Sequence, residues 1–123
     1  MIHFDTNFLI RALEPGTSEE AEMLIWLERG ETIGASVMAW AEFLSGPLHS
    51  GERELADTFI QKIEPLCPAD AEKAAELFNA TGRRSRTLAD CLIAAVALRL
   101  GASVATANAD DFKPFVTHGL VLA

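Results

Sequence analysis

Two kinds of apolar pattern follow one another along this chain, and together they predict alternating helices and strands. Within residues 52–63, Leu55, Phe59 and Ile63 recur every four residues, so they lie on one face of a helix. Residues 88–98 are instead almost wholly apolar, which is typical of a helix in the centre of a fold. We predict helices over residues 6–13, 17–30, 37–44, 52–63, 70–82 and 87–100, and strands over residues 2–5, 32–36, 102–106 and 120–122.

Turn-forming residues separate these predicted elements. Pro15-Gly16 and Gly46-Pro47 each end a helical stretch, and Gly101 ends the apolar helix. Strands that alternate with helices form a parallel sheet with helices on both faces. We therefore predict a single α/β domain over residues 1–123, a three-layer α/β/α sandwich whose central, mostly parallel sheet has four or five strands.

Four acidic residues stand where this topology brings distant segments together. Asp5 ends the first strand, and Glu42 lies about one and a half turns into the helix after the second strand. Asp90 lies in the first turns of the apolar helix, and Asp111 follows the strand over residues 102–106. In a parallel sheet, the carboxyl ends of the strands and the amino ends of the following helices meet at one edge, where ligands tend to bind. We therefore expect all four acids at that edge.

Carboxylates gathered in this way need a cation. Two unit charges about 6 Å apart repel by roughly 3 kcal/mol at an effective dielectric near 20. Oxygen ligands favour Mg²⁺ or Mn²⁺ over zinc, and nothing in the chain has the Cys/His spacing of a zinc site. His3, His49 and His118 are scattered, and we assign them no role. The pattern therefore predicts a metal-dependent site.

Each acid also has a purely structural interpretation. Asp5 suits the cap of the following helix, Glu42 could be an ordinary exposed helical residue, and Asp90 could be a first-turn acid favoured by the helix dipole. Asp110 and Asp111 could be turn residues of a loop. Asp90 is the hardest to explain in this way, because an ionised group in so apolar a helix needs a partner. Four acids at one edge favour a common role.

The charge balance bears on the choice of partners. Eighteen Asp and Glu residues against ten Lys and Arg give a net charge of −8, which argues against a nucleic-acid partner, because basic surfaces usually bind phosphates. A metal would neutralise several of these acids, and Arg83, Arg84 and Arg86 form a basic cluster shortly before Asp90. That cluster could equally be a solvated helix end, and an acidic surface would also suit a basic protein partner.

Composition also bears on the compartment. Half of the residues are apolar, enough for a sizeable core. No apolar run reaches the roughly 20 residues of a membrane span, and the first residues lack the pattern of a signal peptide. Cys67 and Cys91 do not make a disulfide framework, and Cys91 is expected to be a buried free thiol. We expect a cytoplasmic protein.

Four segments carry a resemblance to a known family. They are Asp5-Thr6-Asn7, Ala41-Glu42-Phe43, Asp90-Cys-Leu-Ile-Ala-Ala95 and Thr106-x-Asn108-x-x-Asp111-Phe112. In this order and at this chain length, the sequence resembles the PIN-domain family, specifically the VapC-type toxin ribonucleases of bacterial toxin–antitoxin pairs. The resemblance implies a parallel sheet flanked by helices, an acidic pocket that binds Mg²⁺ or Mn²⁺, and endonucleolytic cleavage of RNA. It also implies a homodimer and a cognate antitoxin protein that covers the site.

The resemblance assigns catalytic and metal-binding roles to residues of this sequence. Asp5, Glu42 and Asp90 match the metal-coordinating acids of the family, and Asp111 matches the acid of its last motif. Asn108 stands where relatives often have Asp, so it could coordinate through its carbonyl oxygen but adds no charge. The implied reaction is hydrolysis of a phosphodiester by an activated water, which leaves a 5′-phosphate and a 3′-hydroxyl and does not use the ribose 2′-hydroxyl.

Further residues would support this site. Thr6, Asn7 and Thr106 would hold the carboxylates by hydrogen bonding. The candidates for contacts with RNA phosphates are Arg83, Arg84, Arg86 and Lys113.

Other functions stay open beside this one. A phosphatase or phosphotransfer domain of the same architecture would need a second Asp where Asn7 stands, or paired acids with a late lysine, and no P-loop motif is present. A PIN-like module that binds RNA or protein without cutting it is kept open by Asn108. A DNA-directed nuclease would use the same acids, because the chemistry does not require ribose.

Overall fold

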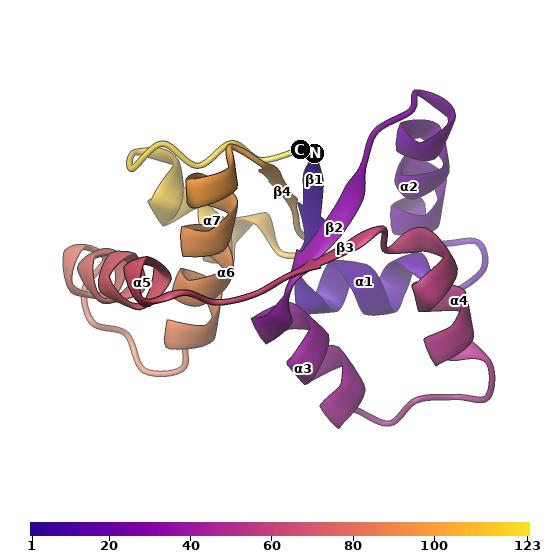
Figure 1. Cartoon of the computed structure of the whole chain (residues 1–123), viewed down its shortest axis with the longest axis horizontal. Coiled ribbons are helices and arrows are strands. Elements are labelled where there is room, and N and C mark those ends of the chain that lie inside the picture. The colour runs from indigo at the N-terminus through magenta and orange to yellow at the C-terminus, as the bar shows by residue number, and fades with distance from the viewer.

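A four-stranded parallel sheet forms the centre of the computed structural model, which describes residues 1–123 (Figure 1). Its strands are β1 (Ile2–Phe4), β2 (Ile33–Ser36), β3 (Lys62–Glu64) and β4 (Ser103–Ala105), and their order across the sheet is β3-β2-β1-β4. In the register, Ile2 lies opposite Ile33 on one side and Ser103 on the other. Because all pairings are parallel, the carboxyl ends of the strands share one edge of the sheet.

Helices cover both faces of this sheet and confirm the predicted three-layer α/β/α sandwich. They are α1 (Thr6–Ala12), α2 (Ser18–Glu28), α3 (Val37–Ser45), α4 (Glu52–Phe59), α5 (Pro68–Ala80), α6 (Leu88–Leu100) and α7 (Ala109–Val116). One core joins Ile2 and Phe4 of β1 to α1, α2 and α4, and the other joins Val104 of β4 to α5, α6 and α7. Helix α3 contributes Phe43 to the first core and Ala39 to the second, so it packs against both cores.

Helix α6 is the central element of its layer, as its composition predicts. Cys91 and the run from Ile93 to Ala97 are buried. Gly101 ends the helix with φ +66°, a left-handed conformation that glycine adopts without strain. The buried middle fixes the two ends of the helix, with Asp90 near the first and Arg99 near the last. None of the seven helices combines the length and the apolar composition of a membrane-spanning segment.

One predicted helix is too long. The pattern predicted a single helix over residues 52–63, but α4 ends at Phe59 and β3 follows. The Gln61 N–H donates to the Ile33 carbonyl at 2.9 Å, and the Gln61 side-chain oxygen accepts the Ile33 N–H at 3.1 Å. Ile63 is 37% exposed on the edge strand instead of continuing a helix face. Pairing with the distant backbone of β2 therefore overrides the local helical spacing.

The end of the chain also differs from the prediction. The expected strand over residues 120–122 is reduced to one isolated bridge with β4, and it brings the C-terminus beside the N-terminus (Figure 1). Residues expected in a loop form α7, whose Phe112 and Phe115 are buried against the core. The sequence of this segment is typical of a loop, because it has two acidic residues at its start and Pro114 in its interior. The segment is nevertheless helical, because the helix buries both phenylalanines.

Candidate acidic site

Asp5 stands directly after β1 and caps α1. Its Oδ1 accepts a hydrogen bond from the Phe8 N–H at 2.7 Å, and its side chain is buried. Burial raises the pKa of Asp5, and the charges of Asp111 and Glu42 raise it further, while hydrogen bonds from Thr106 and Phe8 lower it. The structural interpretation as a cap is therefore correct but incomplete, because a cap does not need two further acids nearby.

Glu42 reaches the same edge from α3. Its Oε1 accepts a hydrogen bond from Thr6 Oγ1 at 2.7 Å, which ties α3 to the start of α1. The helix itself begins at Ser36, a buried residue whose Oγ accepts the Ala39 N–H at 3.2 Å. Sequence reasoning did not single out Ser36, although a hydroxyl residue between a strand and a helix is the usual signal of such a cap. Ser36 and Thr6 together orient Glu42 toward the segment that carries Asp5.

Asp90 has the most strongly perturbed pKa of the four acids. It is half-buried in the first turn of α6, and its carboxylate forms no hydrogen bond or ion pair. Burial raises the pKa of Asp90 from 3.8 to about 6, with contributions from the charges of Asp111, Asp5 and Glu42. All three other acids therefore lie close enough to act on Asp90, and the fold brings the four together.

The segment after β4 presents Asp111 to the site and turns Asp110 away. Asn108 Nδ2 donates to Asp111 Oδ2 at 2.9 Å, and the Asn108 N–H donates to Thr106 Oγ1 at 3.0 Å. Asp110 instead pairs with Lys113 at 3.0 Å, where both side chains are exposed. Although Asp111 is exposed as well, its charge raises the pKa of Asp90 and of Asp5. Of these adjacent acids, only Asp111 belongs to the acidic site.

The donor chemistry of the acidic site fits Mg²⁺ or Mn²⁺. The candidate ligands are carboxylate, amide and hydroxyl oxygens, without Cys or His. The ion pairs of the molecule all lie elsewhere, so no Lys, Arg or His neutralises these acids. The ligands are not preassembled, since no group of three or more His, Cys, Asp or Glu side chains lies in an arrangement that could hold a metal ion.

Of the three residues predicted to support the carboxylates, two reach the site. Thr6 donates a hydrogen bond to Glu42, and a hydrogen bond from the Thr106 side chain lowers the pKa of Asp5. Asn7 is exposed and forms no hydrogen bond with any of the four acids. The structure thus gives Asn7 no contact that explains a supporting role.

The basic cluster lies in the loop between α5 and α6. Arg83, Arg84 and Arg86 are exposed, and none of them forms an ion pair. The Arg83 guanidinium lies over the Phe78 ring at 5.7 Å. Arg83 and Arg86 have φ angles of +54° and +72°, a left-handed region that few non-glycine residues adopt. The loop leads into the first turn of α6, so it holds three unpaired cations on the side of the molecule where Asp90 lies.

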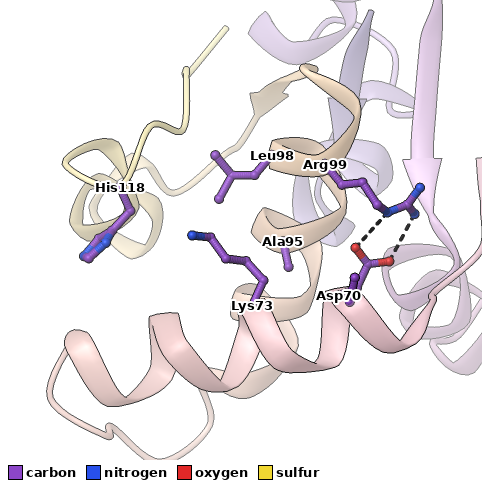
Figure 2. A pocket seen from close by; sticks show the side chains of 7 residues that line it. Asp70, Lys73, Ala95, Leu98, Arg99 and His118 are labelled. Carbon is purple, nitrogen blue, oxygen red and sulfur yellow. Dashed lines mark hydrogen bonds and ion pairs between the residues drawn. The ribbon is translucent and has the colours of Figure 1, made fainter.

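A separate cavity lies near the other end of α6 (Figure 2). It measures about 350 Å³ and contains none of the four acids. Its floor includes Asp70, which accepts hydrogen bonds from Arg99 Nε at 2.9 Å and Nη2 at 3.0 Å. Sequence reasoning treated Asp70 only as the start of a helix and did not single out Arg99. One charged residue near the end of an apolar helix was the signal that could have revealed this pair.

Comparisons with known proteins agree with this architecture. A family model described as PIN domain matches residues 2–115. VapBC-1 from nontypeable Haemophilus influenzae is similar over 100% of this chain and 97% of that chain, at 20% identity and a TM-score of 0.73. VapBC2 from Rickettsia felis, bound to a DNA fragment from their promoter, covers 100% and 98% at 20% identity and a TM-score of 0.72. A toxin–antitoxin complex from Klebsiella pneumoniae covers 92% and 91% at 21% identity and a TM-score of 0.71. No curated protein matches the sequence.

Proposed function

Because this chain belongs to the PIN-domain family, we propose that it is a metal-dependent endoribonuclease and the toxin of a toxin–antitoxin pair. The convergence of four acids without a basic partner carries the proposal. Asp90 reports it most directly, because burial and the three other acids raise its pKa to about 6. A strongly perturbed group of this kind is typical of a functional site.

Asp5, Glu42 and Asp90 would hold the cation, with Asp111 beside them and the Asn108 carbonyl oxygen as a neutral donor. When bound, Mg²⁺ or Mn²⁺ supplies a Lewis acid that activates water and stabilises the charge on the phosphate oxygens. The cation would also offset the repulsion from the other acids, which adds to burial in raising the pKa of Asp90.

The protein itself contributes positioning. The Phe8 N–H and the Thr6 hydroxyl hold Asp5 and Glu42 by hydrogen bonds of 2.7 Å each. These donors lie on α1, so one short helix orients two of the acids. No lysine or histidine lies among the acids to act as a general base, so activation of the water depends on the cation and the carboxylates.

The proposed reaction is hydrolysis of an RNA phosphodiester. The water oxygen forms a bond to phosphorus, the bond from phosphorus to the 3′ oxygen breaks, and that oxygen takes up a proton. The products carry a 5′-phosphate and a 3′-hydroxyl. Arg83, Arg84 and Arg86 would bind backbone phosphates, since they are exposed and unpaired in a chain of net charge −8. Lys113 is a weaker candidate, because Asp110 already pairs with it.

Two protein partners belong to this proposal. One solved structure of the same fold is a toxin–antitoxin complex, and we expect a cognate antitoxin to bind this chain and inhibit it. A small reading frame beside the gene would encode the candidate antitoxin, and co-purification of its product with this chain would test the expectation. The expected homodimer is tested by light scattering on the purified chain, where the mass of a monomer would be 13.3 kDa.

Cleavage of end-labelled total RNA tests the nuclease. Purified protein, free of antitoxin, is incubated with Mg²⁺ or Mn²⁺ and, in parallel, with excess EDTA. We expect discrete products that need the metal and that disappear with Asp5→Asn and Asp90→Asn. Asp111→Asn should also lose activity, whereas Asp110→Asn, which alters the adjacent acid outside the site, should retain it. Parallel DNA substrates distinguish a ribonuclease from a DNA-directed enzyme.

The opposite results would reject the nuclease. Products that form in EDTA and persist in both Asn variants come from a contaminant. A non-catalytic PIN-like module is the second candidate, and the observation that favours it is the lack of a preassembled group of three acids. That module is indicated if the protein cuts neither RNA nor DNA and its melting temperature does not change with Mn²⁺.

A further inference from the structure

The cavity near the end of α6 is set apart from the acidic site and has the opposite charge character. It is lined by Asp70 and Lys73 from α5, by Ala95, Leu98 and Arg99 from α6, and by His118 from the segment after α7 (Figure 2). We propose that this cavity binds a small organic anion, a phosphate or carboxylate group carried on an apolar or aromatic body. The inference is independent of the proposed nuclease activity.

The single acid of the cavity does not oppose an anion, because it is fully engaged. Asp70 is 1% exposed, and both of its oxygens accept hydrogen bonds from Arg99. The Cys67 N–H at 2.9 Å and the Cys67 thiol at 3.3 Å donate to it as well. Arg99 Nη2 also donates to the Pro65 carbonyl at 3.0 Å, which holds the guanidinium in place. The pair therefore forms a rigid, nearly neutral wall.

Lys73 supplies the positive charge. Its side chain extends from α5 toward Leu98 and His118, with the amine between the two helices and the C-terminal segment (Figure 2). Its one ion pair is with Glu76 at 3.5 Å, one helical turn further along, and the Glu76 side chain is 64% exposed. Such an exposed pair is weak. An anion in the cavity would therefore compete well with Glu76 for the ammonium group.

His118 lies on the opposite side of the cavity from Lys73 (Figure 2). Its ring forms no hydrogen bond or ion pair, so a ring N–H is free to donate. Lys73 and His118 come from distant segments of the chain, and the cavity brings together a weakly paired ammonium group and an unpaired imidazole. In a chain of net charge −8, an anion would be repelled from most of the surface. Two donors in one cavity beside a neutralised acid are a local exception.

The rest of the lining selects for an apolar body. Ala95 is buried, and Leu98 presents its side chain to the cavity (Figure 2). A volume of about 350 Å³ lies within the range of roughly 300–1,000 Å³ typical of small-molecule sites. Inorganic phosphate would fill a small part of this volume and leave the apolar wall uncovered. An anion with a ring or short chain attached would use both the donors and the wall.

Titration with phenyl phosphate tests the proposal on the full chain, with binding followed by amide chemical shifts. We expect saturable one-to-one binding, with shifts in α5, α6 and the segment around His118. Lys73→Met should weaken binding by at least about tenfold, because it removes a charge-assisted hydrogen bond. His118→Phe keeps the shape of the ring but removes the donor, and should weaken binding by severalfold. Lys62→Met removes the same charge from an exposed position on β3, outside the cavity, and should leave the affinity within about twofold.

Several results would overturn the proposal. They are no saturable binding by the wild type, equal losses with Lys73→Met and Lys62→Met, and shifts confined to the arginine loop between α5 and α6. Inorganic phosphate that binds as tightly as phenyl phosphate would also overturn it, because the apolar wall would then have no role. Benzoate in a parallel titration identifies the preferred head group, since binding of either compound supports the site. Lys73→Gln replaces Lys73→Met if the latter melts at a lower temperature. These titrations do not measure RNA cleavage, so a negative result here would leave the proposed nuclease activity untouched, and the reverse also holds.

Discussion

The two ends of α6 hold an acid in opposite ways. Near its start, Asp90 is half-buried with no partner, and burial together with three nearby acids raises its pKa to about 6. Near its end, Arg99 meets Asp70 of α5. Burial acts to raise the pKa of Asp70, but the hydrogen bonds from Arg99 and Cys67 outweigh it and leave that pKa lowered. One end of α6 therefore carries an acid whose charged form is destabilised, and the other end supplies the arginine that stabilises the charged form of an acid on α5.

This difference separates a site from a structural element. Asp70 is fully hydrogen-bonded to Arg99 and Cys67, so it stabilises the packing of α5 on α6 and needs no ligand. Asp90 has no partner within the chain. Three arginines precede it closely and could have paired with it, but Arg83, Arg84 and Arg86 remain in the exposed loop. A buried charge without a protein partner is costly. The missing partner is the cation that we propose.

The largest expected effect on stability is at the structural end. Asp70→Ala removes a buried acceptor of four hydrogen bonds, from Arg99 Nε and Nη2 and from the Cys67 N–H and thiol. We expect the free energy of unfolding in urea to fall by about 2–3 kcal/mol, from the lost cap and the donors left unpaired. Asp110→Ala, at an exposed acid, should change it little. Equal effects of the two substitutions would show that the buried pair does not stabilise the fold.

Metal addition should stabilise the other end. A cation that binds only the folded state adds about 1.4–2.7 kcal/mol at 10 to 100 times its dissociation constant. We expect Mn²⁺ to raise the melting temperature of the wild type and EDTA to reverse the change. The double variant Asp5→Asn/Asp90→Asn should not respond. A similar rise in the double variant would place the Mn²⁺ outside the acidic site.

Without metal, Asp90→Asn should make the protein more stable at pH 7, the opposite sign to Asp70→Ala. The pKa of Asp90 is raised from 3.8 to about 6 in the folded state, so its protonated form is fully stabilising below about pH 4. That contribution is lost as the pH rises through 6. After allowance for solvent screening of a half-buried group, we expect a gain of about 1–2 kcal/mol at pH 7. Urea unfolding between pH 3.5 and 7.5 measures it, and a gain that did not shrink at acid pH would contradict the assignment.

The smallest effect concerns the exposed arginines beside the acidic site. In the background of Asp90→Asn, to prevent cleavage, Arg84→Gln/Arg86→Gln should weaken RNA binding. The slope of log affinity against log salt should become shallower by about 1.4, that is about 0.7 for each lost phosphate contact on a single strand. Arg29→Gln/Lys62→Gln removes the same charge from exposed positions away from the loop and should leave the slope unchanged. Identical slopes in the two double variants would remove the arginine loop from the RNA-binding surface.

Much of the fold follows from local pattern. Apart from the long helix over residues 52–63 and the two changes at the C-terminus, the predicted elements agree with the structure to within two residues. The short apolar strands and the almost wholly apolar helix α6 are determined by local sequence and burial, both of which the apolar pattern reveals. Local sequence does not determine the edge strand β3, because Gln61 and Lys62–Glu64 take their conformation from pairing with β2, some 28 residues away.

For function, the sequence by itself determined which acids would meet. Asp5 and Asp111 follow strands, Asp90 lies in the first turn of a helix and Glu42 lies about one and a half turns into another, so parallel topology predicts that they share an edge. Only the tertiary structure decided their states: the cap on Asp5, the Thr6 hydrogen bond to Glu42 and the lack of any partner for Asp90. It alone also joined Arg99 to Asp70 and set Lys73 opposite His118. Periodicity fixes where a side chain stands along the backbone, whereas hydrogen bonding, burial and charge depend on segments that meet only when the chain folds.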